Sequence, residues 1–205
     1  MKKFELTNEF VTNMFGTKLF RIRALVEFGD VEAGELGGYV EKESNLGHDD
    51  NAWVYDNAWV YGNARVYGDA QVSGDALVCG NALVYDNAWV YGNARVCGDA
   101  LVCGNARVYG NALVCGNARV CSDEDYAYAH GFGSVNRTTT FFRLKDGGVG
   151  VRCGCFYGTL AQFRDKIRET HGETKKAQEY LMLADLMELR FEEDENEVGN
   201  RKYVE

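Results

Sequence analysis

The dominant pattern of the chain is a valine that recurs every six residues from Val54 to Val120. An alanine lies two positions before each valine, and Asn or Asp precedes each alanine. A glycine, or occasionally an aspartate, usually comes before that, so the repeating unit is Gly-Asn-Ala-x-Val-Tyr. A period of six does not fit a helix, because 3.6 residues per turn would spread the valines around the whole cylinder.

Each unit instead predicts a short strand followed by a corner. Alanine and valine are two residues apart, so in an extended strand they share one side, while x and the last residue point to the other side. The Gly-Asn pair is typical of a corner, because Gly adopts positive φ and Asn bonds to the nearby backbone. The repetition predicts a coil, since antiparallel hairpins would need a longer repeat with two distinct strands.

Twelve consecutive units over residues 52–122 resemble the hexapeptide-repeat proteins, a family that includes trimeric acyltransferases. In that family three hexads make one triangular coil in a left-handed parallel β-helix. The resemblance therefore implies four coils, stacked about 4.8 Å apart. The left hand is implied by the resemblance alone, because general crossover rules favour the right hand.

With three hexads per coil, the outward residues of successive coils align on three faces. The first face carries Trp53, Tyr55, Gln71, Ser73, Trp89, Tyr91, Arg107 and Tyr109; the second carries Trp59, Tyr61, Leu77, Cys79, Arg95, Cys97, Leu113 and Cys115; the third carries Arg65, Tyr67, Leu83, Tyr85, Leu101, Cys103, Arg119 and Cys121. Trp, Tyr and Arg are the residues that dominate binding energy at protein interfaces. We predict that a protein partner binds Trp53, Tyr55, Trp59, Trp89, Tyr91, Arg95, Arg107 and Tyr109. Alternatively, stacked aromatic residues stabilise the sheets and bind nothing.

The outward leucines predict a second kind of contact. Apolar faces of this extent are usually covered, either by terminal segments or by another subunit. We predict a homo-oligomer with contacts at Leu77, Leu83, Leu101, Leu113, Leu183 and Met187.

Residues 1–51 predict an N-terminal β cap. A strand is expected over residues 18–28, where Phe20, Ile22 and Ala24 alternate with polar residues. Val40 and Leu46 are six apart, so the stretch 37–41 predicts an atypical first coil. The eight-residue step from Leu46 to Val54 predicts an insertion around residues 48–50.

Residues 123–205 predict a small α+β domain, which completes a mainly β fold class. A hairpin is expected from residues 138–144 and 149–156, joined by the turn 145–148. Thr159 predicts the N-cap of a helix that ends near His171 and Gly172. A second helix over 175–191 is apolar on nearly all sides, which predicts burial on more than one side. The acidic stretch 192–197 is expected to be a solvated end.

Composition and charge narrow the possible functions. Of the 205 residues 46% are hydrophobic and 26% charged, which is typical of a globular protein. Neither a membrane span of about 20 apolar residues nor a signal peptide is evident, so we expect a cytoplasmic protein. Residues 1–51, 52–122 and 123–205 carry 6, 4 and 12 basic against 10, 5 and 16 acidic side chains, a net charge of −4, −1 and −4. We therefore expect no direct binding to nucleic acid.

Seven cysteines are present, and an odd number without an export signal favours reduced thiols. Cys79, Cys97 and Cys115 align on one face, and Cys103 and Cys121 on the next. Neighbouring coils would place these residues within the Cα separation of a disulfide. For a cytosolic protein we nevertheless expect free thiols that replace Tyr as small apolar residues.

No catalytic residue, metal site or cofactor is predicted. The resemblance implies acyltransferases and carbonic anhydrases, both of which use histidine, yet residues 52–122 contain none. Cys153 and Cys155 with His171 fall short of the usual four metal ligands. His130 beside Tyr126 and Tyr128 is the remaining acid–base candidate.

The flanks are similar to uncharacterised hexapeptide-repeat proteins of bacteriophages and mobile elements of Firmicutes-type bacteria. The stretches that carry this resemblance are residues 36–41 and 153–160. It implies an accessory protein, so we predict a non-catalytic protein-binding scaffold that inhibits a host defence effector, as an anti-CRISPR protein does. One alternative is an acyltransferase-like enzyme that uses His48 or His130 at a subunit boundary. Another is a nucleic-acid mimic, whose acidic ends would carry the mimicry.

Overall fold

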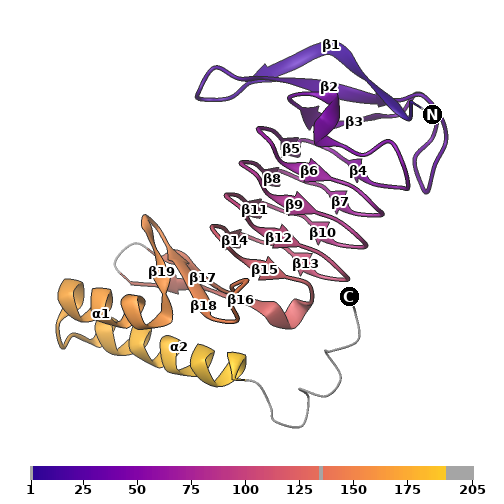
Figure 1. Ribbon diagram of the computed structural model, residues 1–205. Coiled ribbons are helices and arrows are strands. Elements are labelled where there is room, and N and C mark those ends of the chain that lie inside the picture. Colours follow the sequence, from indigo (N-terminus) through magenta and orange to yellow (C-terminus); the bar gives the residue numbers. More distant parts are fainter. Residues whose placement is uncertain (1, 134–135, 193–205) are drawn as a thin grey trace.

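The computed structural model describes residues 2–133 and 136–192. Figure 1 shows a central solenoid, a β cap at its N-terminal end, and a sheet with helices α1 and α2 at its other end. The predicted mainly β fold class is confirmed. The predicted acidic end lies outside the described residues, apart from Glu192.

The solenoid contains one two-residue strand per hexad. In chain order these strands are β4 (Trp53–Val54), β5 (Trp59–Val60), β6 (Arg65–Val66), β7 (Gln71–Val72), β8 (Leu77–Val78), β9 (Leu83–Val84), β10 (Trp89–Val90), β11 (Arg95–Val96), β12 (Leu101–Val102), β13 (Arg107–Val108), β14 (Leu113–Val114) and β15 (Arg119–Val120). Every third strand pairs in parallel, with valine opposite valine, so β4 pairs β7 and β7 pairs β10. The coil of three hexads and the three predicted faces are confirmed, whereas the left hand stays a prediction from the resemblance.

The corners explain the glycines and the aspartates that replace them. Gly68 has a φ of +69°, and a Cβ there would lie 2.9 Å from the backbone nitrogen of Asp86 in the next coil. Asp56 and Asp86 adopt φ values of +53° and +58° at equivalent corners. Their carboxylates accept hydrogen bonds from the backbone N–H groups of Gly74 and Gly104, one coil further on. These bonds offset the cost of a side chain in the left-handed region.

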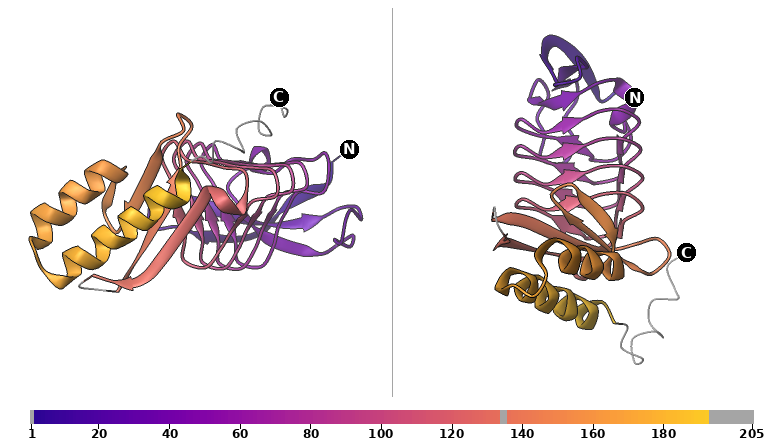
Figure 2. Two further views of the ribbon diagram at one scale, coloured as in Figure 1. Left: turned by 90° about the horizontal axis from the view of Figure 1, so that it is seen from below. Right: turned by 90° about the vertical axis from the view of Figure 1, so that its left-hand side faces the viewer.

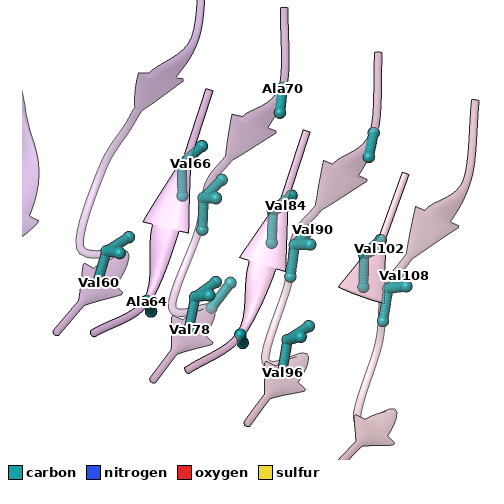
Figure 3. Close-up of a cluster of buried hydrophobic side chains, with 14 of the residues drawn as sticks. Val60, Ala64, Val66, Ala70, Val78, Val84, Val90, Val96, Val102 and Val108 are labelled. Atoms are coloured by element: carbon teal, nitrogen blue, oxygen red, sulfur yellow. The ribbon is translucent and has the colours of Figure 1, made fainter. Parts of the chain in front are cut away.

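Alanine and valine fill the interior of the solenoid. Figure 3 shows Val60, Val78 and Val96 in one column, facing the valines and alanines of the other two faces. All of the repeat valines are fully buried. Each contributes roughly 1.5–3 kcal/mol as an upper value, while the alanines keep the interior narrow.

The N-terminal cap contains β1 (Phe4–Thr12), β2 (Lys18–Ala24) and β3 (Leu36–Val40), followed by a short 3-10 helix at Glu43–Asn45. The strand predicted to reach residue 28 ends at Ala24, because Phe28 and Val31 exchange backbone hydrogen bonds in a separate turn. β1 was not predicted. β3 pairs in parallel with β5, and Leu46 bridges Val66, which is the arrangement that an atypical first coil would have.

The C-terminal sheet contains β16 (Tyr126–Phe132), β17 (Arg137–Arg143), β18 (Val149–Cys153) and β19 (Phe156–Thr159), antiparallel in chain order. A 3-10 helix at Asp123–Asp125 leads into it. The predicted hairpin is β17 and β18, extended on both sides by strands that were not predicted. Helices α1 (Leu160–His171) and α2 (Lys175–Phe191) confirm the predicted ranges, and both lie against one face of this sheet (Figure 2). The Thr159 hydroxyl accepts the predicted cap hydrogen bond from the Gln162 N–H at 3.3 Å.

Strand β17 joins the solenoid to the C-terminal domain. Phe142 belongs to the core of the solenoid, whereas its neighbour Phe141 belongs to the core beneath the helices. Both side chains are fully buried. Because alternate strand residues face opposite sides, one strand closes the solenoid and supports the helices.

Within residues 2–133 and 136–192, we find no helix with the length and apolar character needed to cross a membrane.

Candidate functional site

The eight predicted partner-binding residues do not form one surface. Trp53 is wrong as a contact residue, because its side chain is 0% exposed. Phe4 and Phe28 pack edge-on against its ring, with centroids 6.2 Å and 5.3 Å away. Trp53 therefore holds the N-terminal cap to the first coil.

Other members of the predicted set are separated from one another. Tyr55, also at the N-terminal end of the first face, is partly buried against the solenoid core. Trp59 and Arg95 lie on the second face, in strands β5 and β11. Arg95 is exposed, whereas Trp59 is half-buried beside β3.

The remaining four residues lie together, and we name them the aromatic patch: Trp89, Tyr91, Arg107 and Tyr109. Trp89 is 44% exposed and Tyr109 41% exposed, although both are large aromatic side chains. The guanidinium of Arg107 lies over the Trp89 ring, 5.7 Å from its centroid. Tyr91 and Tyr109 stack with centroids 5.3 Å apart and an interplanar angle of 15°. In-register pairing of β10 with β13 produces both contacts.

The C-terminal sheet extends the aromatic patch with residues that the sequence analysis did not assign to it. Tyr126 and Tyr128 meet the Tyr109 ring edge-on, with centroids 6.4 Å and 6.0 Å away. Together with Asp123 and Arg190 of α2, these tyrosines line a cavity of about 410 Å³ beside the patch. The alternation of Tyr126, Ala127 and Tyr128 was a strand signal that could have indicated this extension.

The residues of the acid–base candidate around His130 have other partners among the described residues. The Tyr126 hydroxyl donates to the backbone oxygen of Arg107 at 2.6 Å, and burial raises the pKa of Tyr126. His130 is exposed, and its Nδ1 lies 2.9 Å from the Thr138 hydroxyl oxygen. Tyr126 is thus tied to the last coil of the solenoid, and His130 to the neighbouring strand β17.

The predicted oligomer contacts have mixed outcomes. Met187 is wrong as an outward contact, because it is buried in the core between the helices and the C-terminal sheet. Leu183 is partly buried against that core. The outer side of α2 instead exposes Met182, Leu186 and Leu189. The sequence alone could not show which residues of α2 face the C-terminal sheet, because the helix is apolar on nearly all sides.

The solenoid leucines are all half-buried: Leu77, Leu83, Leu101 and Leu113. A terminal segment covers part of the second face, since the Thr140 hydroxyl of β17 accepts a hydrogen bond from the Leu113 N–H at 2.9 Å. A contact of these leucines with a second copy stays a prediction.

The cysteines confirm the predicted alignment but not the predicted redox state of one pair. Cys103 and Cys121 form a disulfide, with Cα atoms 4.4 Å apart. The expectation of free thiols is wrong at this pair, because stacking of the coils places the two residues within disulfide range. Cys79, Cys97 and Cys115 are free thiols in a column on the second face. We name these three residues the thiol column.

A second cavity, of about 250 Å³, lies between the C-terminal sheet and α1. Cys153, Cys155 and His171 line it together with Arg137 and Lys166. The structure thus brings together the three residues that the sequence offered as incomplete metal ligands. Among residues 2–133 and 136–192, however, no group of three or more His, Cys, Asp or Glu side chains is arranged to hold a metal ion.

Cys153 and Tyr180 have structural partners in this second cavity. Cys153 accepts a hydrogen bond from the Thr139 hydroxyl at 3.2 Å. Burial raises the pKa of Tyr180 to about 12, and its hydroxyl donates to the backbone oxygen of Phe132 at 3.2 Å. These bonds link the wall of the cavity to the sheet.

Comparison with known proteins supports the repeat architecture. The model of the YdcK β-solenoid repeat matches residues 58–74, 78–92, 88–104 and 102–116, all within the solenoid. No curated protein matches the chain. The matched segments cover less than half of the chain, so the likeness concerns the coils and not the cap or the C-terminal domain. The chain is a β-helix repeat protein whose coils are similar to the YdcK β-solenoid repeat.

Proposed function

We propose that the chain is a non-catalytic scaffold that binds a protein partner through the aromatic patch. One observation carries the proposal: Trp89 and Tyr109 remain 44% and 41% exposed on a rigid face, with the Arg107 guanidinium held over Trp89. Trp, Tyr and Arg dominate the binding energy of protein interfaces when a partner removes them from water. The patch therefore combines suitable residues with a fixed arrangement.

Rigidity favours binding, because less side-chain and backbone entropy is lost on association. Backbone hydrogen bonds hold the two strands, since the N–H groups of Trp89 and Tyr91 donate to Ala106 and Val108 at 2.9 Å. The stacked tyrosines of the patch occupy neighbouring coils. The patch thus needs little rearrangement when a partner arrives.

Charge indicates the chemistry of that partner. Arg107 lies in the patch, and Arg190 lines the adjoining cavity, where Asp123 is the one acidic residue among the described residues of the lining. A partner surface with an acidic side chain next to apolar groups would complement this arrangement. We therefore propose a protein partner with an acidic loop that enters the cavity beside Tyr109.

The alternatives have less support. His48, proposed as an acyltransferase base, stacks on Phe4 with ring centroids 4.5 Å apart. Its Nδ1 accepts the backbone N–H of Lys3 at 3.2 Å, so this nitrogen is engaged within the cap. Nucleic-acid mimicry would use the acidic ends, whereas the aromatic patch carries arginine. The enzyme and the mimic stay weaker proposals.

The biological setting also stays a prediction. The phage or mobile-element origin and the anti-CRISPR-like role against a host defence effector rest on the resemblance of the flanks alone. The cytoplasmic location and the homo-oligomer rest on sequence patterns. A scaffold with one exposed binding face is compatible with an inhibitor that covers a host protein. Identification of the partner would test this setting directly.

Affinity capture with matched variants tests the function. Wild-type chain, the double variant Trp89→Ala/Tyr109→Ala and the control Arg65→Ala would be immobilised and exposed to extract of the organism that encodes the chain. Arg65 is exposed over Tyr67 on the third face, away from the patch. We expect one protein to be retained by wild type and control but lost with the double variant.

Calorimetry with that purified protein then measures the effect. We expect the double variant to bind at least about 30-fold more weakly, which corresponds to a hot spot of about 2 kcal/mol. Equal binding by the double variant, or failure of wild type to retain any protein specifically, would contradict the proposal.

A further inference from the structure

The thiol column occupies the same position in three successive coils. Cys79, Cys97 and Cys115 each follow a buried repeat valine, at intervals of three hexads. The Cys79 N–H donates to the Val96 oxygen at 2.9 Å, and the Cys97 N–H donates to the Val114 oxygen at 3.0 Å. Neighbouring rungs of a parallel sheet are about 4.8 Å apart, within the Cα range of a disulfide. The outer two thiols are separated by two rungs, about 10 Å, which is too far.

The same solenoid shows that adjacent rungs can be joined. Cys103 and Cys121 are also three hexads apart and occupy the equivalent position on the next face, where they form a disulfide. The backbone spacing of this coil is therefore compatible with a covalent bond between neighbouring rungs. The thiol column has two such gaps but an odd number of thiols, so one thiol stays free whenever a bond forms.

Side-chain interactions link the neighbouring members of the thiol column. The Tyr61 hydroxyl contacts Cys79, the Cys79 thiol contacts Cys97, and the Cys97 thiol contacts Cys115. The bond to Cys97 and burial raise the pKa of Cys79. The interaction with Cys97 lowers the pKa of Cys115, and the Arg152 guanidinium lowers it further, although burial opposes both. Cys115 is therefore the thiol that ionises most readily of the three.

Arg152 is a second observation at the Cys115 end of the column, besides the pKa of that thiol. It lies in β18, which pairs with β17 against the last coil. Its Nε is buried and has no hydrogen-bond partner among residues 2–133 and 136–192. A thiolate at Cys115 would supply negative charge near this guanidinium, whereas a neutral thiol does not.

We propose that Cys79, Cys97 and Cys115 form a redox site, at which a small peroxide creates one disulfide that moves between the two gaps of the column. Hydrogen peroxide is the oxidant. The Cys115 thiolate attacks one peroxide oxygen, the O–O bond breaks, and the departing hydroxide takes a proton to become water. Cys115 is then a sulfenic acid.

Cys97 completes the oxidation. Its sulfur attacks the Cys115 sulfur, the S–S bond forms as the S–O bond breaks, and the hydroxide leaves as water with the Cys97 proton. Two thiols and one peroxide have then given one disulfide and two waters. The Cys79 sulfur next attacks the Cys97 sulfur. The Cys79–Cys97 bond (the upper bond) forms as the Cys97–Cys115 bond (the lower bond) breaks, and the Cys79 proton passes to the Cys115 sulfur. A dithiol reductant restores all three thiols.

Peptide mapping can locate each bond. Cleavage after arginine places Cys79 in residues 66–95, Cys97 in 96–107 and Cys115 in 108–119. Residues 96–107 also contain Cys103, so the experiment uses a Cys103→Ser/Cys121→Ser background. The reduced protein is treated with hydrogen peroxide, free thiols are alkylated under denaturing conditions, and the linked peptides are quantified by mass spectrometry. We expect each molecule to lose two of the three thiols of the column, and dithiothreitol to restore them. Across the population, some molecules should carry the Cys79–Cys97 link and others the Cys97–Cys115 link.

Three variants in this background serve as controls, each with its fold checked by circular dichroism. Cys97→Ser removes the shared middle thiol, so disulfide formation within the column should fall at least tenfold. Cys115→Ser retains the upper pair but should slow its oxidation at least tenfold. Cys79→Ser should retain only the lower link. Absence of any link in the column, a Cys79–Cys115 link in Cys97→Ser, or wild-type oxidation rates in Cys115→Ser would overturn the proposal.

Discussion

At the scale of single residues, burial by distant segments decides the role of a side chain. Trp53 and Trp89 occupy the same position in coils of the same face, since both pair with Gln71. One is wholly buried and the other is 44% exposed, because the cap covers only the first coil. The repeat unit therefore fixes where a side chain points, and the flanking segments fix whether it meets water.

Lys3 shows how this cover affects charge. Its ammonium donates to the backbone oxygens of Asp50 and Ala52 at 3.1 Å and 2.8 Å, and it lies 4.5 Å from the centroid of the Phe28 ring. Burial lowers the pKa of Lys3 from 10.5 to about 8, against the opposing charges of nearby aspartates. In the folded protein Lys3 thus loses its proton at a lower pH than in the unfolded chain.

We predict that this difference makes the free energy of unfolding rise with pH. Between about pH 8 and 10.5 the unfolded chain holds the proton and the folded chain does not, so stability attributable to Lys3 increases by up to about 1.4 kcal/mol per pH unit. The measurement is urea unfolding of wild type and Lys3→Met at pH 7.5 and 9.5. The difference in the free energy of unfolding between wild type and Lys3→Met should change with pH. The control Lys2→Met, at an exposed lysine, should show the same pH dependence as wild type. A difference in the free energy of unfolding that does not change with pH would contradict the lowered pKa of Lys3.

At the scale of elements, the local signals predicted the structure well. The valine period, the Thr159 cap and the glycines of the corners each act within a few residues, and the solenoid strands and both predicted helices formed where expected. Residues 126–129 alternate between Tyr and Ala, a signal too short to predict the whole strand, and residues 156–159 show no such alternation. Both segments become strands because β17 and β18 offer edges for pairing. The inner side of α2 depended likewise on the sheet beneath it, which is why Met187 was misassigned.

The two sides of a solenoid strand should respond very differently to the same side chain. Ala94 is fully buried, and Arg95 next to it is exposed. We predict that Ala94→Leu lowers the free energy of unfolding by about 1–3 kcal/mol, because the narrow interior has no room for three more carbons. Arg95→Leu is the matched control and should change it by less than about 0.5 kcal/mol. Leucine already occurs at the position equivalent to Arg95 in the coils above and below.

Chemical unfolding in urea, read by circular dichroism, distinguishes these cases. A midpoint that is lowered in Ala94→Leu and unchanged in Arg95→Leu supports the packing argument. Equal effects of the two substitutions would mean that the interior tolerates volume or that the outer face is packed as tightly.

At the scale of the whole molecule, the solenoid is a stack of coils between two closures. Phe4 and Trp53 belong to its core at the N-terminal end, and Phe142 belongs to it at the other end. Each coil contacts mainly its neighbours, so stability is expected to be close to a sum over coils and their interfaces. The closures are local to the first and last coils, which leaves the number of coils between them free to vary.

Deletions of different length test this arrangement. Removal of residues 75–92 takes out one coil of three hexads and joins Gly74 to Asn93, which preserves the Gly-Asn-Ala order. We predict a cooperatively folded, shorter chain. Removal of residues 75–89 takes out two and a half hexads, which is shorter but breaks the six-residue register. Strands after the deletion would then lie over corners of the coil before it, and their backbone hydrogen bonds would be lost. We expect this shorter deletion to be the more destabilising, as measured by thermal unfolding and hydrogen exchange. If stability instead followed the number of residues removed, register between coils would not be what holds the solenoid together.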